Sequence, residues 1–167
     1  MTASLSTFST EANLVRSFVS GLRSDSPWGE LQIATEWDYR TGVTDVLTRN
    51  VRGDIIAFEA KLRDWRKAAH QAYRNTVFAK KAYVVLPSTI AERACLAGDL
   101  FKRYRVGLCS IENKCIRIVI EAPANEALMP WLHARAQCFF DNAACYRQRT
   151  KSPSCRGRDL RTAECVA

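Results

Sequence analysis

Apolar residues recur along the chain with two different periods, and each period predicts a different element. In residues 11–22, Leu14, Phe18 and Leu22 follow one another at a spacing of four, which is typical of the buried face of a helix. Residues 64–80 contain neither glycine nor proline and are rich in alanine and straight-chain residues, so they predict a second helix. Further helices are expected at residues 88–104 and 127–146.

Short apolar or alternating blocks predict six strands, at residues 31–40, 43–48, 54–62, 82–86, 106–111 and 115–121. The first three strands can form a meander, whereas the later strand–helix–strand passages require parallel crossovers. We therefore expect an α/β fold in which a mixed central sheet is flanked by helices. Residues 1–148 are expected to form a single domain. Residues 149–167 show no apolar period and are expected to form a basic, cysteine-containing flexible tail.

Composition narrows the functional class. The chain has 167 residues, 47% hydrophobic and 25% charged, which suits one globular domain and argues against wholesale disorder. A net charge of +8 favours a polyanionic partner, with nucleic acid first. No apolar run reaches the 18 or so residues that span a bilayer, and the N-terminal residues lack the features of a signal peptide. We expect a cytoplasmic, intracellular protein without a membrane partner.

The seven cysteines are then expected to be mostly reduced thiols. Those at the C-terminal end lie seven or ten residues apart, whereas structural zinc sites use pairs two to four residues apart, so a zinc site is disfavoured. Cys95, Cys109 and Cys115 lie in apolar runs and are expected to be small core residues.

Three polar residues lie where the second and third predicted strands would pair. If these strands form a hairpin, Asp45 lies roughly opposite Glu59, with Cβ atoms about 5 Å apart. Side-chain alternation would point Glu59 and Lys61 the same way, with Ala60 opposite. Two carboxylates that close repel, so one takes up a proton unless a cation lies between them, and a hard divalent ion such as Mg²⁺ suits oxygen ligands. The alternative is a ladder of ion pairs on the surface of the sheet, although the apolar block 55–58 indicates a central, buried strand.

Asp45, followed after a short hairpin by Glu59-Ala60-Lys61, resembles the motif of the PD-(D/E)XK nuclease superfamily. The order of helix, three strands, helix and strand is similar to the core of that superfamily. The stretch KLRDWRKAAHQAYRNTVFAKKAYVVLP also resembles its usual continuation, a helix bearing a glutamine and then a hydrophobic strand. The resemblance covers residues 11–87, about half of the chain. It implies a restriction-endonuclease-like fold, an α-β-β-β-α-β core to which this chain adds a C-terminal α-β-β-α part.

The resemblance implies that the catalytic residues are Asp45, Glu59, Lys61 and Gln71. It also implies Mg²⁺, for which Mn²⁺ can substitute, held by Asp45, Glu59 and the carbonyl group of Ala60. Lys61 would be the catalytic lysine, which orients or deprotonates the nucleophile or neutralises charge on the phosphate.

Two further acids are candidates for an auxiliary role. Glu11 matches the acidic residue often found on the first helix of the superfamily, and Glu36 lies on the polar strand face expected to include Ala34 and Asp38. The chain departs from the motif at Thr44, where the name of the superfamily has proline. That position varies within the superfamily.

A basic stripe is expected along the helix at residues 64–80, formed by Arg63, Lys67, His70 and Arg74. Beside a metal site, such a stripe would follow the phosphates of a nucleic acid. The alternative is a solvated helix face without a ligand.

We expect a metal-dependent nuclease, a Mg²⁺-dependent phosphodiesterase that acts on nucleic acid and in the first place on DNA. Cleavage of both strands by one site per chain would favour a homodimer. One alternative is a catalytically inactive, nuclease-like protein that binds nucleic acid or serves in assembly, against which the intact Asp/Glu/Lys set argues. Another is a protein-interaction domain whose basic tail docks an acidic partner.

Overall fold

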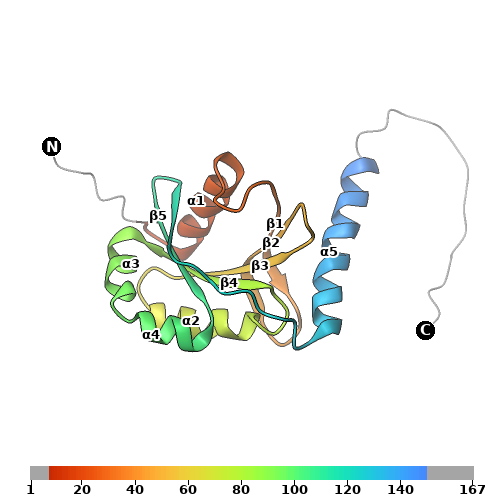
Figure 1. Ribbon diagram of the computed structural model, residues 1–167. Helices are drawn as coiled ribbons and strands as arrows, with labels where there is room; N and C mark the ends of the chain where they lie inside the picture. The colour runs from red at the N-terminus through yellow and green to blue at the C-terminus, as the bar shows by residue number, and fades with distance from the viewer. Residues whose placement is uncertain (1–7, 150–167) are drawn as a thin grey trace, which may run out of the picture.

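The computed structural model describes residues 8–149, and the side chains of residues 8–142 (Figure 1). The expected tail therefore lies outside the described residues apart from Arg149. The elements follow in the order α1 (Glu11–Ser24), β1 (Leu31–Asp38), β2 (Val43–Asn50), β3 (Ile55–Ala60), α2 (Trp65–Asn75), β4 (Lys81–Pro87), α3 (Ser88–Cys95), α4 (Gly98–Tyr104), β5 (Gly107–Glu112), β6 (Cys115–Ile120) and α5 (Pro130–Arg149).

The strands form one sheet in which sequence order and spatial order coincide, β1-β2-β3-β4-β5-β6. Strands β1, β2 and β3 form an antiparallel meander, β3, β4 and β5 are mutually parallel, and β6 is antiparallel to β5. Helices cover both faces, with α1 on one face and α2 on the other (Figure 1). The predicted mixed α/β architecture is therefore confirmed, because parallel neighbours need crossover helices and both faces of the sheet must be covered.

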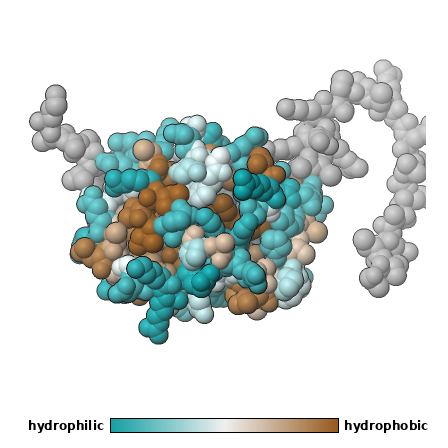
Figure 2. All heavy atoms as spheres, viewed as in Figure 1, coloured by the Kyte–Doolittle hydropathy of each residue, from teal (hydrophilic) through white to brown (hydrophobic). Residues whose placement is uncertain are grey.

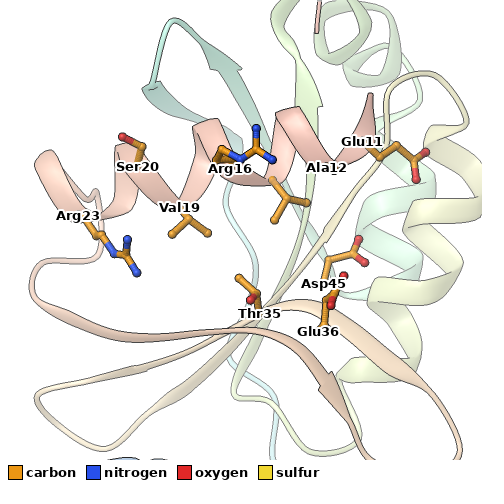
Figure 3. Close-up of a pocket in the computed structure, with 10 residues that line it drawn as sticks. Glu11, Ala12, Arg16, Val19, Ser20, Arg23, Thr35, Glu36 and Asp45 are labelled. Atoms are coloured by element: carbon orange, nitrogen blue, oxygen red, sulfur yellow. The ribbon is translucent and has the colours of Figure 1, made fainter. Parts of the chain in front are cut away.

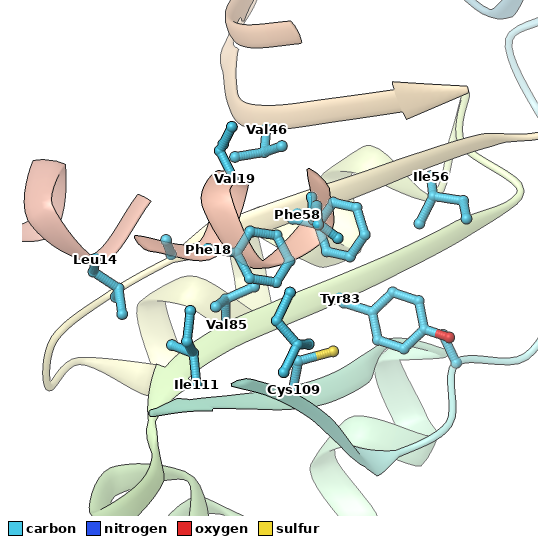
Figure 4. Close-up of a cluster of buried hydrophobic side chains, with 14 residues drawn as sticks. Leu14, Phe18, Val19, Val46, Ile56, Phe58, Tyr83, Val85, Cys109 and Ile111 are labelled. Atoms are coloured by element: carbon cyan, nitrogen blue, oxygen red, sulfur yellow. The ribbon is translucent and has the colours of Figure 1, made fainter. Parts of the chain in front are cut away.

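One core lies between α1 and the sheet. Leu14 and Phe18 are fully buried, and the Phe18 ring packs edge-on against Phe58 of β3 with ring centroids 5.0 Å apart (Figure 4). Tyr83 of β4 stacks on the other side of Phe58, at 5.7 Å. The four-residue spacing that predicted this helix thus identified its buried face.

The opposite face of the sheet carries two further cores. The buried alanines of α2 pack with α3 and α4 on β4 and β5, and α5 packs over β1, β2 and β3 through Leu132, Ala136 and Phe140. Every residue of β3 is buried, as the apolar block before Glu59 predicted. Proline is tolerated at the first position of α5 because that N–H would have no partner within the helix.

Two predicted helices end earlier than expected. Residues 88–104 form two helices, because Ala97 leaves helical geometry with φ of −98° and ψ of 37° and a new helix starts at Gly98. Helix α2 ends at Asn75 rather than at residue 80, since the Thr76 hydroxyl donates to the carbonyl oxygen of Tyr73 and the chain turns there.

The four cysteines with described side chains are all free. Cys109 in the middle of β5 is buried, as expected, but Cys95 and Cys115 are exposed. The prediction for these two was wrong because they occupy the last position of α3 and the first of β6, where an apolar neighbourhood in sequence does not bring burial.

The face of the molecule seen in Figure 2 is mostly hydrophilic, with separate hydrophobic areas. Within the described part of the chain, no helix is long and apolar enough to cross a membrane.

Candidate active site

A tight turn between β2 and β3 sets the pairing of the strands that carry the candidate site. The side-chain oxygen of Asn50 accepts hydrogen bonds from the backbone N–H groups of Arg52 and Asp54, both at 2.9 Å. Gly53 adopts φ of 83°, a left-handed conformation that glycine reaches without steric cost. The turn therefore fixes the register of the hairpin.

That register brings the two acids of the motif together. Val46 pairs with Phe58, so continuing the antiparallel ladder by one step places Asp45 opposite Glu59. The Oδ2 atom of Asp45 accepts a hydrogen bond of 2.8 Å from the backbone N–H of Ala60. The juxtaposition expected from sequence is thus found in the structure.

Glu59 is a buried carboxyl group with one occupied and one free oxygen. Its residue is 1% exposed. The Asn75 side-chain amide of α2 donates to Oε1 at 2.6 Å, whereas Oε2 is buried and has no hydrogen-bond partner among the described residues. A buried acceptor without a donor is costly unless a proton or a cation satisfies it.

Burial and the neighbouring Asp45 carboxylate raise the pKa of Glu59 to about 8, against the opposing effects of the Asn75 hydrogen bond and the Lys61 charge. The acid pair therefore holds a proton at neutral pH. A divalent cation would displace that proton on binding.

Lys61 follows β3 and keeps its charge. Its Nζ atom forms an ion pair of 2.9 Å with Oε2 of Glu11, the first residue of α1. Burial alone would lower the pKa of Lys61, but the Glu11 hydrogen bond and the charges of Asp45, Glu11 and Glu59 outweigh it and raise the pKa above its usual value. At neutral pH Lys61 is thus an ammonium group, which can donate hydrogen bonds and neutralise negative charge but cannot accept a proton.

The expectation that Glu59 and Lys61 point the same way holds only in part. The Glu59 side chain reaches Asn75 of α2, while Lys61 reaches Glu11 of α1, on the other face of the sheet. Because β3 ends at Ala60, the alternation of side chains along the strand does not determine the direction of the Lys61 side chain.

Helix α2 contributes two amides to the site region, of which the sequence indicated one. Gln71 is half-buried, and its Oε1 atom is buried without a partner among the described residues. Asn75 lies one turn further along the same helix face and holds Glu59. Its own oxygen accepts from the Thr44 hydroxyl at 3.2 Å and the Tyr39 hydroxyl at 3.4 Å. The spacing of four from Gln71 was the signal that could have revealed Asn75.

Glu36 does not lie on a strand face shared with Ala34 and Asp38. It adopts φ of 54°, and beyond it Trp37 packs in the same core cluster as Ala34, so alternation breaks at Glu36. The cause of the wrong prediction is this left-handed conformation, which an extended strand does not contain. Glu36 is exposed and lines a cleft together with Asp45 (Figure 3).

That cleft, of about 620 Å³, separates α1 from β1 and β2. The lining residues are Glu11, Ala12, Val15, Arg16, Val19, Ser20 and Arg23 of α1 and Thr35, Glu36 and Asp45 of the sheet. The three acids gather at one end of the cleft (Figure 3). Glu11 also lines a second hollow, of about 550 Å³, over the C-terminal ends of β3, β4 and β5. Glu11, the ion-pair partner of Lys61, thus lines both hollows.

All four residues of the basic stripe are exposed: Arg63, Lys67, His70 and Arg74. Arg63 does not lie on the helix as expected, because α2 begins at Trp65 after its N-cap Asp64. Arg74 donates to the carbonyl oxygen of Thr41 at 2.7 Å, and the His70 ring lies edge-on to Tyr104. This exposure agrees with both interpretations, a phosphate-binding stripe and a solvated helix face, and does not distinguish them.

No three His, Cys, Asp or Glu side chains within the described residues lie close enough to form a metal site by themselves. A metal here would depend on two carboxylates, the Ala60 carbonyl and water. This oxygen-only donor set suits Mg²⁺, which usually keeps several waters and binds one or two protein carboxylates. The free Oε2 of Glu59 fits such an ion as well.

No family model matches the sequence, and no curated protein matches it. Among solved structures, a protein of unknown function from Silicibacter pomeroyi is similar with a TM-score of 0.62 and 17% identity, over 84% of this chain and 90% of that chain. A repair endonuclease from Pyrococcus abyssi gives a TM-score of 0.47 and 18% identity, over 64% of this chain and 48% of that chain. The first similarity shows a shared fold, and any conclusion about activity depends on the chemistry of the site.

Proposed function

We propose that the protein is a metal-dependent nuclease of the PD-(D/E)XK type, with a restriction-endonuclease-like fold, that hydrolyses phosphodiester bonds in nucleic acid. DNA is the expected substrate. The observation that carries the proposal is the buried Glu59 carboxyl, which faces Asp45, leaves Oε2 without a donor and adjoins the charged Lys61. If these residues served only stability, apolar residues of similar size would stabilise the fold at least as well, because burying charged groups costs free energy.

Mg²⁺ is the proposed cofactor, with Mn²⁺ as a substitute, and Asp45, Glu59 and the Ala60 carbonyl would hold it. When bound, such an ion supplies a Lewis acid for the phosphate and lowers the pKa of a water nucleophile. The cost of bringing two carboxylates together would then be offset by the charge between them.

The chain's own residues have separate tasks in this proposal. Asn75 holds Oε1 of Glu59, which leaves Oε2 for the cation, and the Ala60 N–H holds Oδ2 of Asp45. Lys61, as an ammonium group, would neutralise charge that develops on the phosphate oxygens. Gln71 would contact the substrate or Lys61 from α2.

The proposed partner is nucleic acid, with a homodimer as the arrangement for cutting both strands. The basic stripe of α2 would supply affinity that does not depend on sequence and weakens with salt.

The test is cleavage of plasmid DNA and of single-stranded DNA with Mg²⁺ or Mn²⁺. Glu59→Gln and Lys61→Gln preserve size and should each lower the rate by about a hundredfold or more. Lys102→Gln, an exposed lysine of α4, removes the same charge elsewhere and should cut like the wild type. Cleavage that survives both site variants would contradict the site. Salt-sensitive binding without cleavage in any metal would favour the catalytically inactive alternative.

A further inference from the structure

Helix α1 presents one continuous stripe to the cleft beneath it. The stripe consists of Glu11, Ala12, Val15, Arg16, Val19, Ser20 and Arg23, whose spacing alternates between one and three residues. This is the spacing of a single helix face. The whole length of α1 therefore forms one wall of the cleft, facing β1 and β2 (Figure 3).

Charge is separated along this wall. Glu11 lies at one end, near Asp45 and Glu36, while Arg16 and Arg23 lie further along the helix (Figure 3). Both arginines are exposed, and neither forms an ion pair with an acid among the described residues. Arg16 donates only to the Asn13 side chain of its own helix, at 3.0 Å. Two guanidinium groups without an acidic partner in the described part of the chain, further along the cleft from its three acids, suit a ligand that carries several negative charges.

The size of the cleft and the apolar residues on its α1 wall indicate what kind of ligand fits. Ala12, Val15 and Val19 place apolar atoms between the charged positions. Seven residues separate Arg16 from Arg23, about 10 Å along the helix axis, or about three nucleotides of a stacked strand at 3.4 Å each. A cleft of about 620 Å³ has the size of a small-ligand pocket, which admits a few nucleotides and excludes a duplex.

We infer that the cleft beneath α1 binds a single strand of nucleic acid, with Arg16 and Arg23 contacting phosphates on one side of the bond that faces Asp45. This inference rests on the proposed function, since it places the strand relative to the cleavage site. It adds contacts from α1 to those proposed for the basic stripe, which lies on the opposite face of the sheet.

The test measures binding apart from cleavage, by fluorescence anisotropy of a labelled single-stranded oligonucleotide in EDTA between about 50 and 200 mM salt. Arg16→Ala/Arg23→Ala should bind about tenfold or more weakly than the control. Because each lost phosphate contact removes about 0.7 from the slope of log K against log salt for single strands, its slope should be smaller by about 1.4. Arg16→Lys/Arg23→Lys keeps both charges and should restore most of the slope.

The matched control is Arg103→Ala together with Lys102→Ala, which removes two exposed charges from α4 on the other face. Equal affinity and slope for the cleft variant and this control would overturn the inference, and cleavage by the wild type would then leave the nuclease standing. Loss of affinity in the cleft variant alone, with no cleavage by the wild type, would support the cleft and contradict the nuclease. Failure of the wild type to bind single strands would overturn the inference.

Discussion

The Glu59 carboxyl group is buried beside Asp45, and its burial makes the free energy of unfolding depend on pH. In the unfolded chain the glutamate has its usual pKa of 4.5, whereas in the folded protein burial and Asp45 raise the pKa of Glu59 to about 8. Between these values the folded state binds more protons than the unfolded state. The free energy of unfolding therefore falls as pH rises from about 4.5 to about 8, and this contribution is level above that.

Glu59→Gln should remove this dependence. Since each tenfold change in proton affinity is worth about 1.4 kcal/mol, the metal-free variant should be about 3 to 5 kcal/mol more stable than the wild type at pH 8.5 and close to it at pH 5. Urea denaturation in EDTA at several pH values measures the difference. Glu36→Gln changes an exposed acid of the cleft that Asp45 lines and should keep the wild-type pH dependence. If the free energy of unfolding changed with pH equally in the wild type and in Glu59→Gln, the assignment of the buried proton to Glu59 would be contradicted.

Asn75→Asp tests the residue that holds Glu59. The variant has the same shape but loses the donor to Oε1 and adds a third carboxylate to a buried site, so it should be destabilised by about 2 to 4 kcal/mol, and more at pH 8 than at pH 5. Urea denaturation of the two proteins gives the values. Asn142→Asp, on the exposed side of α5, adds the same charge and should change stability by less than about 0.5 kcal/mol. A loss independent of pH would show that Asn75 acts only through packing.

At this scale the sequence could predict what depends on strand geometry alone. The positions of Asp45 and Glu59 follow from a hairpin of short loop and from the register that the turn sets. The spacing of four from Gln71 indicates that Asn75 shares its helix face, but the contact of Asn75 with Glu59 depends on how α2 lies on the sheet. The left-handed conformation of Glu36 has no local sequence signal, since it is not a glycine.

At the scale of elements, α1 approaches the β5–β6 turn so closely that only glycine fits at position 21. A Cβ atom there would meet the carbonyl oxygen of Lys114, which is backbone and cannot move aside, and the side chain of Ile116. The close approach fixes the position of the helix that carries Glu11 and Arg16.

Gly21→Ala should therefore destabilise the protein by about 1 to 3 kcal/mol, even though alanine favours a helix by about 1 kcal/mol in an exposed position. Thermal unfolding measures the change. Ser20→Ala, at the neighbouring position of the same helix, meets no such backbone atom and should be neutral or stabilising. A Gly21→Ala protein as stable as the wild type would show that α1 can shift away from the turn.

Helix periodicity located α1 and its buried face, but it did not predict the break between α3 and α4. Leu96 at the break is 90% exposed and Phe101 in α4 is fully buried. The break lets Ala91 and Ala94 of α3 and Phe101 of α4 all join the core of the α2 face. Such a tertiary preference overrides a continuous stretch of good helix formers.

At the scale of the whole molecule, cation binding should be linked to global stability. A ligand that binds only the folded protein raises the free energy of unfolding by about 2.7 kcal/mol when its concentration is a hundred times its Kd. Mg²⁺ should therefore raise the melting temperature of the wild type at pH 8, and EDTA should reverse the effect. Glu59→Gln should lose most of this response, while Lys102→Gln should keep it. An equal shift in the wild type and Glu59→Gln would place the ion elsewhere.

The overall architecture was predictable because it needs only the order of elements and rules of connection. Three strands in a meander, then strands joined by helices, give a mixed sheet with helices on both faces. The sequence does not predict which face of the sheet each helix covers, because β3 and β4 are buried on both faces and their pattern does not distinguish the two. It therefore does not predict that α1 and α2 reach the site from opposite sides.

The coincidence of sequence order with spatial order has a kinetic consequence. Every strand pairs with its neighbour in sequence, so the first contacts to form are short-range, and the β2–β3 hairpin is among the shortest. That hairpin cannot close without bringing the carboxylates of Asp45 and Glu59 face to face. An unfolded chain above pH 5 thus begins to assemble its sheet against electrostatic repulsion, and the proton that relieves it must be taken up during folding. We expect the refolding rate of the wild type to fall as pH rises towards 8. Glu59→Gln, which removes one of the two charges, should refold at a rate that does not fall in this way.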